Sequence, residues 1–452
     1  MLEKYPKFKF TLKLLASLLP DTLLEKREYK DYRSFLEGTK NWGNNEVLEF
    51  QNLQLRLVLQ HSMENVPYYQ EVWNNYGIKI KQIQNVSDLK ELPLIDKEIV
   101  KLNREKFIAG NINKNHLIPI NTGGTTSSPL HFFNTKTTNN REWAFYKMIW
   151  SEFGYNNELV LFLRGRFGKF EGLFEYNPYR KYLIINTENF SEKKMLETLN
   201  LIYEKKPKFI QAYPSMIFLL SKFINENKYH SQVTSIKGIF CASEKMFDFQ
   251  KEEISKAFNC PVIDYYGHNE RLVLMVRQGI EKYEILPEYG IAEFLNNENM
   301  NVNEEGQQAE IVGTGFNNYA FPLIRYKTGD IATLGPIKKY KNRPIEMRTI
   351  SEIDGRSGDF LKTADGKYYS PTMLEFAIRY ISNFKDLQLV QTDIENLIVY
   401  IVPTENYSSA EGEKFKQALA ERIAYSIKIN IKIVTSINRP DNLKHRFLVS
   451  KL

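Results

Sequence analysis

The sequence predicts an α/β protein with a large N-terminal domain, built from α/β sheets plus a β-rich layer, and a small mobile α+β C-terminal domain. Its 452 residues, of which 42% are hydrophobic, are sufficient for about three domains or subdomains with full cores. Between about residues 140 and 270, short apolar runs alternate with helical stretches, which is typical of a sheet covered by helices. After about residue 283, short strands separated by Gly and Asn turns indicate the β-rich layer.

The first part of the chain, to about residue 115, is predicted to be a mostly helical scaffold. A helix is expected over Glu46–Ser62, and Val66-Pro67 ends it because proline does not continue a helix. Pro93 marks a second turn. It is followed by Asp96, a suitable N-cap for a helix through Val100.

The middle of the chain predicts the sheet. Five apolar runs are expected to be buried strands: Leu159–Leu163, Tyr182–Ile185, Phe209–Ala212, Ile236–Cys241 and Pro261–Tyr265. Helical stretches near 191–205, 215–226 and 246–258 fill several of the gaps, and Ser191 and Ser215 are suitable N-caps for two of them. Ligands of such sheets bind at the carboxyl ends of the strands. Two polar clusters follow strands there, Ala242–Glu244 and Tyr266–Arg271, and both stand where a nucleotide site requires them.

The region from 283 to about 350 contains short strands such as Glu310–Val312 and Ile331–Leu334, which predict a small β-rich layer or a distorted barrel. Within it, Thr328-Gly329-Asp330 is either a simple turn or part of a site. Asp354–Asp359 contains two glycines that permit large backbone changes, so we expect the hinge there. The predicted domains are therefore 1–354, with an α/β subdomain at about 115–282 and a β-rich subdomain at about 283–354, followed by 355–452.

The C-terminal region predicts a compact α+β unit. Ser370-Pro371 is expected to open a helix that reaches about Ser382. Leu397–Val402 is a predicted strand, and Ile429, Ile431 and Ile433 alternate as another. Between these strands, four apolar residues fall on one helical face: Phe415, Ala418, Leu419 and Ile423.

One stretch, Asn121–Leu130, combines two glycines with five hydroxyl side chains between two apolar runs. The flanking runs, Leu117–Ile120 and Leu130–Phe133, are short and β-branched or aromatic, so the loop is expected to join two strands. Glycines let backbone N–H groups converge and the hydroxyls add donors, which suits a loop that holds phosphate groups. It is not a Walker A loop, because no lysine follows and a strand comes next. A flexible hairpin turn is the alternative.

The composition limits the partners and the compartment. The net charge of +7 is spread over 61 basic and 54 acidic residues without a dominant basic block, which argues against nucleic acid and leaves small anionic substrates open. Cys241 and Cys260 are the only cysteines, so we expect no disulfide framework, no zinc site and a cytoplasmic setting. The apolar patches of Phe10–Leu19 are too short to span a bilayer, and no transmembrane segment is expected.

Several of these segments, in this order and spacing, resemble one family over nearly the whole chain. The sequence resembles the adenylate-forming enzymes of the acyl-CoA synthetase superfamily, and most closely the phenylacetate-CoA ligase-like branch that includes the CapK proteins of capsular polysaccharide loci. The resemblance runs from Asn65–Tyr69 and the Pro93–Lys97 segment to Lys444, and includes the hydroxyl-rich loop, the Tyr-Gly-x-x-Glu segment at 266–270 and Tyr-Lys-Thr-Gly-Asp at 326–330. Four motifs in the expected order favour the phosphate interpretation of the loop.

This resemblance implies a nucleotide site. The ATP phosphates are expected to bind six loop residues: Thr122, Gly123, Gly124, Thr125, Thr126 and Ser127. The other nucleotide contacts are expected from seven residues: Ser243, Glu244, Tyr266, Gly267, Asn269, Asp330 and Arg356. In the family pattern Tyr266 stacks on adenine, Asp330 binds both ribose hydroxyls, and Arg356 contacts ribose and phosphate from the domain junction.

The resemblance also implies the catalytic residues. Glu270 is expected to coordinate Mg²⁺ and Lys444 to enter from the mobile domain, while His268 either lines the acyl pocket, gates the nucleophile tunnel or is only hydrogen-bonded in its loop. The sequence departs from the family pattern at Asn269, where Thr or Ser is usual, and at Leu443, where Gly commonly precedes the lysine. Because of the second departure, Lys451 is the alternative to Lys444.

The implied activity is ATP-dependent activation of a carboxylic acid as an acyl-adenylate, followed by transfer to coenzyme A with release of AMP and pyrophosphate. Transfer of the acyl group to an amine, as in polysaccharide or secondary-metabolite biosynthesis, is the alternative, and a non-catalytic binding relative is a third class. The expected partners are a carboxylic acid and a thiol or amine acceptor, with a homodimer left open. Four aromatic residues are expected to line an apolar or aromatic acyl pocket: Phe167, Phe170, Tyr213 and Phe240.

Overall fold

A computed structural model gives the architecture of the chain. It describes residues 27–121, 130–164, 172–178, 180–187, 190–243, 245–279, 281–356, 361–364, 368–369, 374, 377, 380–381, 383–423, 427–437 and 447–452. The hydroxyl-rich loop at 122–129, the predicted hinge residues 357–359, most of the predicted helix at 370–382 and the segment that contains Lys444 lie outside these residues.

The N-terminal region is helical, as predicted. Its described elements are α3 (Arg27–Thr39), α4 (Asn44–Asn65), α5 (Pro67–Asn75), η2 (Ile80–Gln82), η3 (Val86–Glu91), α6 (Lys97–Leu102), η4 (Arg104–Phe107) and η5 (Lys114–His116). Val66 is extended and Pro67 opens the next helix, which confirms the predicted break. The Asp96 side chain accepts a hydrogen bond of 2.8 Å from the backbone N–H of Ile99, so its N-cap role is also confirmed.

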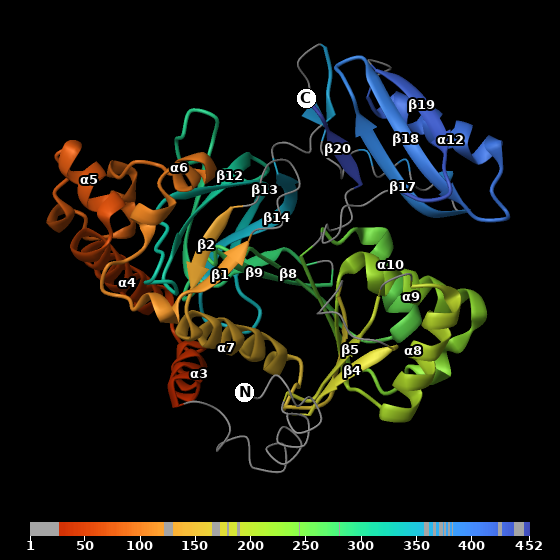
Figure 1. Cartoon of the computed structure of the whole chain (residues 1–452), viewed down its shortest axis with the longest axis horizontal. Coiled ribbons are helices and arrows are strands. Elements are labelled where there is room, and N and C mark those ends of the chain that lie inside the picture. Colours follow the sequence, from red (N-terminus) through yellow and green to blue (C-terminus); the bar gives the residue numbers. More distant parts are fainter. Residues whose placement is uncertain are drawn as a thin grey trace.

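A single twelve-stranded sheet crosses the N-terminal domain (Figure 1). Its strands are β3 (Val160–Leu163), β4 (Phe174–Asn177), β5 (Tyr182–Ile185), β6 (Phe209–Ala212), β7 (Gly238–Ala242), β8 (Val262–Gly267), β9 (Leu274–Gln278), β10 (Tyr283–Ile285), β11 (Gly290–Leu295), β12 (Gln308–Gly315), β13 (Tyr326–Lys339) and β14 (Glu346–Arg356). The spatial order is β11-β12-β13-β14-β10-β9-β8-β7-β6-β3-β5-β4. All five predicted strands are present. The β-rich region continues the same sheet and forms no separate barrel.

The parallel part of the sheet is covered by helices on both faces. The covering helices are α7 (Lys136–Glu152), α8 (Glu192–Lys205), α9 (Pro214–Asn227) and α10 (Asp248–Phe258), with η6 (Tyr229–Gln232) after α9. Along β3, Val160 and Phe162 pack in the core beneath α7, whereas Leu161 and Leu163 pack against α8, α9 and α10. Alternate strand residues point to opposite faces, so a continuous apolar run is expected for a strand that is buried on both sides.

The start of α9 differs from the prediction. Pro214 occupies the first helical turn and Tyr213 is the N-cap, so Ser215 lies inside the helix. Proline has the fixed φ that the first turn of a helix requires, and this favours a start at Pro214. Ser191 is at the N-cap of α8 as predicted, although its side chain makes no capping hydrogen bond.

The antiparallel part of the sheet packs against the N-terminal helices. A buried ion pair joins Arg325, the residue before β13, to Glu293 in β11, with the Arg325 Nη2 and Glu293 Oε1 atoms 2.8 Å apart. Arg325 Nη1 also donates to the carbonyl of Leu92 at 2.6 Å, and the backbone of Ile95 bonds to Arg325 and Lys327. These contacts fix the segment after Pro93 against the start of β13.

The C-terminal domain contains a four-stranded sheet and a separate two-stranded one. Its elements are β15 (Leu361–Lys362), β16 (Tyr368–Tyr369), β17 (Phe384–Gln391), β18 (Asn396–Pro403), α12 (Ser409–Arg422), β19 (Lys428–Ile433) and β20 (Leu448–Ser450). The four-stranded order is β19-β18-β17-β20, and the predicted strands and the buried face of α12 are confirmed. The domain lies above α9 and α10 in Figure 1, where the rings of Phe247 and Phe447 are 6.4 Å apart.

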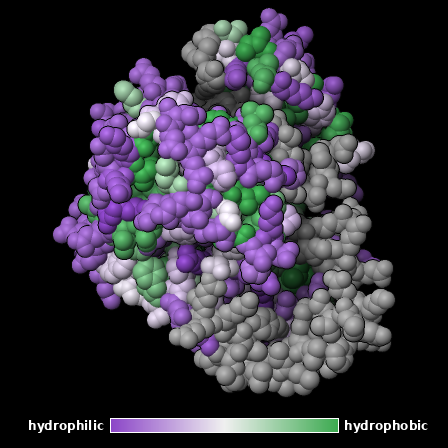
Figure 2. Space-filling model, turned by 60° about the vertical axis from the view of Figure 1, so that its left-hand side comes forward, coloured by the Kyte–Doolittle hydropathy of each residue, from purple (hydrophilic) through white to green (hydrophobic). Residues whose placement is uncertain are grey.

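The outer face of the N-terminal helices is mainly hydrophilic. Figure 2 brings this side of the molecule forward and shows hydrophobic side chains in small groups among hydrophilic ones. Three leucines of α4 are among the exposed apolar residues of the described chain: Leu48, Leu53 and Leu57. The buried face of α4 carries Leu55, Val58 and Leu59, so the helix is amphipathic as its sequence indicates.

Candidate active site

The sheet changes from parallel to antiparallel between β8 and β9, and the predicted Glu270 lies on this connection. β7 and β8 are parallel, whereas β8 and β9 pair antiparallel with Gly267 opposite Leu274. The backbone N–H of Arg271 donates to the carbonyl of His268 at 3.0 Å, which closes a tight turn around Asn269 and Glu270. Glu270 is 8% exposed. The turn therefore holds a nearly buried carboxylate at the carboxyl end of β8.

Tyr266 and Asp330 lie side by side. The Tyr266 hydroxyl donates a hydrogen bond of 2.6 Å to Oδ2 of Asp330. Burial raises the pKa of Tyr266 well above its ordinary value, and the negative charge of Asp330 raises this pKa further. The phenol is therefore protonated at neutral pH and is a permanent donor to Asp330. The ring of His268 is 5.8 Å from the Tyr266 ring, so both aromatic residues belong to this site.

The Thr328-Gly329-Asp330 segment is a bulge in β13, with Gly329 at a φ of +75°. The Thr328 hydroxyl accepts from the backbone N–H of Asp330 at 3.1 Å and donates to the carbonyl of Ile311 at 2.8 Å. Glycine is suited to this left-handed backbone because it has no Cβ atom. The threonine and the glycine thus orient the aspartate, and the segment is more than a simple turn.

Two further predicted residues border this site. Ser243 follows Ala242, whose register partner on β8 is Tyr265, so Ser243 lies next to the end of β8. Its φ of +75° is uncommon for a residue with a Cβ atom. On the other side, the backbone of Arg356 in β14 is paired with Asp330 in β13. The pairing of β13 with β14 therefore places the predicted domain junction beside Asp330.

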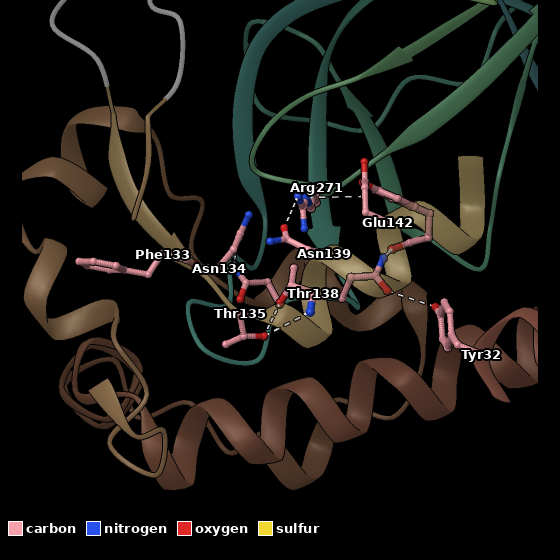
Figure 3. A network of polar contacts seen from close by, with 11 residues as sticks. Tyr32, Phe133, Asn134, Thr135, Thr138, Asn139, Glu142 and Arg271 are labelled. Carbon is pink, nitrogen blue, oxygen red and sulfur yellow. Dashed lines mark hydrogen bonds and ion pairs between the residues drawn. The ribbon is translucent and has the colours of Figure 1, made fainter. Parts of the chain in front are cut away.

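A network that the sequence did not predict holds the Glu270 turn against α7 (Figure 3). Arg271 donates from Nη2 to Oδ1 of Asn139 at 2.8 Å, and its Nε lies 3.7 Å from Oε2 of Glu142. Glu142 is 7% exposed and also accepts a hydrogen bond of 2.5 Å from Tyr289. Arg271 has a φ of +59°, so this backbone geometry is maintained by its contacts. No local signal in the sequence pairs Arg271 with a residue about 130 positions away.

The segment after Arg271 packs directly on glycine backbone. A Cβ atom at Gly290 would lie 2.1 Å from the carbonyl oxygen of Leu272, and one at Gly313 would lie 2.5 Å from the Leu272 Cβ. Gly315 is similarly close to Leu272. The Gly313-Thr314-Gly315 spacing was the available sequence signal, because glycine in a strand often marks a close backbone approach.

The structure brings together only part of the predicted site. The described residues that meet at the ends of β7, β8 and β13 are Ser243, Tyr266, Gly267, His268, Asn269, Glu270 and Asp330, together with the backbone of Arg356. Thr122, Gly123, Gly124, Thr125, Thr126, Ser127, Glu244 and Lys444 lie outside the described residues. The loop still joins two strands as predicted, because β1 (Ile118–Asn121) and β2 (His131–Asn134) pair antiparallel on either side of it.

The predicted aromatic pocket is wrong at Phe240. This side chain is fully buried in the core beneath α7, with its ring 5.0 Å from Trp150 and 5.6 Å from Phe209. Phe240 therefore packs the sheet against the helix. Phe167 and Phe170 lie outside the described residues.

Among the described residues no three His, Cys, Asp or Glu side chains are placed to hold a metal ion together. The single carboxylate of Glu270 suits Mg²⁺, which in nucleotide sites binds one or two carboxylates and the substrate phosphates. Cys241 is buried and Cys260 is partly buried, and neither forms a disulfide bond within the described chain. None of the described helices is long and apolar enough to cross a membrane.

Comparisons with known proteins show what the chain is similar to. The family model described as the CapK C-terminal domain matches residues 361–451. Protein CapK of Staphylococcus aureus is 25% identical over 450 residues, which cover 97% of this chain and 96% of that protein. The chain is homologous to CapK and to the phenylacetate-CoA ligases. Among the latter, the phenylacetate-coenzyme A ligase of Aromatoleum evansii is 23% identical over 89% of this chain and 92% of its own length.

The chain also shares its fold with a solved structure. A crystal structure of 2-hydroxyisobutyryl-CoA ligase in the postadenylation state, in complex with R3-HIB-AMP, matches with a TM-score of 0.71 and 17% identity. The match covers 91% of each chain. The predicted fold of a large α/β domain followed by a smaller C-terminal domain is therefore confirmed.

Proposed function

We propose that this protein activates a carboxylic acid with ATP as an acyl-adenylate and then transfers the acyl group to coenzyme A. The observation that carries the proposal is the hydrogen bond between Tyr266 and Asp330, because it unites two motifs of the adenylate-forming pattern. The relatives that match nearly the whole chain include phenylacetate-coenzyme A ligases, and this supports the same reaction type.

In the first half-reaction, a carboxylate oxygen of the acid attacks the α-phosphorus of ATP. The bond from that phosphorus to the pyrophosphate oxygen breaks, and acyl-AMP and pyrophosphate form. Asp330 accepts hydrogen bonds from the ribose hydroxyls, for which its two oxygens are suited. Tyr266 holds the Asp330 carboxylate in place and offers its ring to the adenine. Arg356 and the loop residues Thr122–Ser127 contact the phosphates.

Charge accumulates at the phosphorus during this step and requires positive partners. Mg²⁺, when bound, neutralises phosphate charge, and Glu270 is the residue that would hold it. Arg271 keeps the Glu270 turn against α7 through Asn139 and Glu142. Lys444 supplies a second positive charge from the C-terminal domain.

We also propose that the domain boundary lies at 354/355 and that the C-terminal domain moves between the two half-reactions. Phe447, three positions after Lys444 in the sequence, contacts Phe247, which is three positions after Glu244. This contact supports an approach of the C-terminal domain to the nucleotide residues during adenylation. In the second half-reaction the thiol sulfur attacks the acyl carbonyl and AMP leaves. The second candidate function is transfer of the acyl group to an amine. The match to CapK over 97% of the chain supports this candidate.

The test is acid-dependent release of pyrophosphate from ATP and Mg²⁺, measured over a panel of aryl, fatty, hydroxy and amino acids with and without coenzyme A. We expect release with at least one acid, and its loss in Glu270→Ala and Lys444→Ala. Lys451→Ala tests the alternative assignment, because Lys451 is the only lysine after Lys444, and release should persist in this variant if Lys444 is the catalytic lysine. Turnover that requires coenzyme A would identify a thioester ligase, and turnover with an amine alone would identify an amide ligase. ATP binding without release for any acid would contradict the proposal.

A further inference from the structure

A layer of polar side chains lies at the carboxyl ends of the parallel strands, on the face covered by α7. It consists of Arg164, which follows β3, Gln211 in β6 and Tyr265 in β8, and we call it the polar layer. Gln211 donates from Nε2 to the Tyr265 hydroxyl, and Arg164 Nη2 lies 3.4 Å from the same oxygen. Gln211 is 1% exposed and Tyr265 is 3% exposed. Three hydrogen-bonding groups thus occupy a position where apolar packing is the usual arrangement.

The polar layer contains hydrogen-bonding capacity that the described residues do not use. Among the described residues, Nε of Arg164 and Oε1 of Gln211 are buried and have no hydrogen-bond partner. Reversing the Gln211 amide would leave its nitrogen without a partner instead of its oxygen, because only one of these two atoms faces the Tyr265 hydroxyl in either orientation. Within the described chain Arg164 forms no ion pair with a carboxylate. Buried polar atoms without partners are rare in folded proteins, and these two are available to hydrogen-bond a bound molecule.

Helix α7 connects the polar layer to the Glu270 turn. Tyr146 packs on Tyr265 with ring centroids 5.3 Å apart, and Tyr146 is hydrogen-bonded to Glu142 one helical turn earlier. Glu142 in turn faces Arg271, which follows Glu270. Through Tyr146, Glu142 thus links Arg271 to the polar layer.

Tyr265 and Tyr266 are successive residues of β8, and their side chains point to opposite faces of the sheet. Tyr266 bonds to Asp330, the predicted ribose ligand, whereas Tyr265 points to the opposite face, toward α7. An acid whose carboxylate reaches the phosphorus beside Glu270 therefore has the nucleotide on one side and the α7 face for its remaining atoms.

We propose that the acid carries a polar oxygen substituent, a hydroxyl or a second carboxylate, and that Arg164 binds this substituent with Tyr265. The inference rests on the proposed adenylation. It replaces the apolar or aromatic acyl group that the aromatic residues of the sequence suggested. Gln211 is a positioning residue in this arrangement, because it holds the Tyr265 hydroxyl toward Arg164.

The experiment compares acids in matched pairs that differ only by the polar group: butyrate with β-hydroxybutyrate and with succinate, and phenylacetate with para-hydroxyphenylacetate. Pyrophosphate release is measured for the full chain and for Arg164→Leu, Arg164→Lys and Tyr265→Phe. Arg180→Leu is the matched control, because Arg180 is an exposed arginine at the amino end of β5 in the same sheet. ATP binding without acid is measured for each variant to show that the nucleotide site is intact.

We expect the polar member of a pair to have a kcat/KM at least about 10-fold higher than the apolar member, as for one hydrogen bond to a charged group. Arg164→Leu should abolish this preference, mainly by raising KM for the polar acid, while Arg164→Lys retains part of it. Comparison of β-hydroxybutyrate with succinate shows whether the preferred substituent is a hydroxyl or a second carboxylate. If apolar acids are preferred, or Arg164→Leu changes both members equally, the inference is wrong although adenylation stands. If no acid releases pyrophosphate, adenylation itself fails, and the inference with it.

Discussion

The hydroxyl of Tyr266 and the carboxylate of Asp330 are joined by a 2.6 Å hydrogen bond although 64 positions separate them in the sequence. We expect Asp330→Ala to raise KM for ATP about 10- to 100-fold, because a charged acceptor for the ribose is lost. Tyr266→Phe keeps the ring and should have the smaller effect. Steady-state kinetics with varied ATP tests both variants. An unchanged KM in Asp330→Ala would exclude a ribose contact.

Arg271 should affect catalysis indirectly, because it holds the Glu270 turn against α7. In Arg271→Met the turn loses its hydrogen bond to Asn139, and the Glu142 carboxylate loses its cationic partner but keeps Tyr289. We expect kcat to fall by about 100-fold, as for a small displacement of a catalytic group, with partial recovery in Arg271→Lys. The measurement is pyrophosphate release together with thermal unfolding. A lower melting temperature with unchanged kcat would show that Arg271 is only structural.

Gly290 should tolerate no side chain. The carbonyl oxygen of Leu272 is backbone and lies 2.1 Å from the position of an added Cβ, so Gly290→Ala must displace one of two packed strands. We expect a loss of about 3 kcal/mol or more in the free energy of unfolding. Gly38→Ala in α3 is the control, because nothing lies within 4 Å of its Cβ position, and it should change stability by less than about 1 kcal/mol. Equal effects in urea unfolding would refute the close approach.

The buried pair of Arg277 and Asp264 should be costly to break. Their Nη2 and Oδ2 atoms are 3.2 Å apart, and Tyr283 also donates to Asp264. Arg277→Met leaves a buried carboxylate without its cation and should destabilise the fold by about 3–5 kcal/mol. Removal of Lys106 from its exposed pair with Glu71 should cost less than about 1 kcal/mol. Urea unfolding of Arg277→Met and Lys106→Met gives the comparison, and a similar small loss in both would contradict it.

Stability should fall at alkaline pH. Burial raises the pKa of several tyrosines well above the ordinary value, among them Tyr69, Tyr146, Tyr266, Tyr283 and Tyr289. The unfolded chain loses these protons near pH 10 and the folded chain keeps them, so their contribution is complete below about pH 10 and is lost above it. Urea unfolding across this range, with tyrosinate absorbance, measures the effect. Full tyrosinate absorbance in a protein that is still folded would contradict these directions.

The strands and helices around the site could be predicted because their signals are local. The apolar run at 159–163 and the Asp96 N-cap depend on neighbouring residues only, and both are confirmed. The prediction that Ser215 is an N-cap was wrong, because the helix already begins at the proline before it, whose fixed φ suits the first helical turn. Phe240 was assigned to a pocket and is wrong, since the sequence does not indicate which aromatic residues face a helix and which face a ligand.

By itself the sequence determined the order of the elements, the loop between two strands and the motifs at the ends of β8 and within β13. Only the tertiary structure decided that β9 to β14 continue the same sheet, that Arg271 meets Glu142, and that Arg164, Gln211 and Tyr265 form one layer. Side-chain periodicity repeats within a few residues and is therefore visible in the chain. The pairing of distant strands depends on the packing of whole faces, which no short segment specifies.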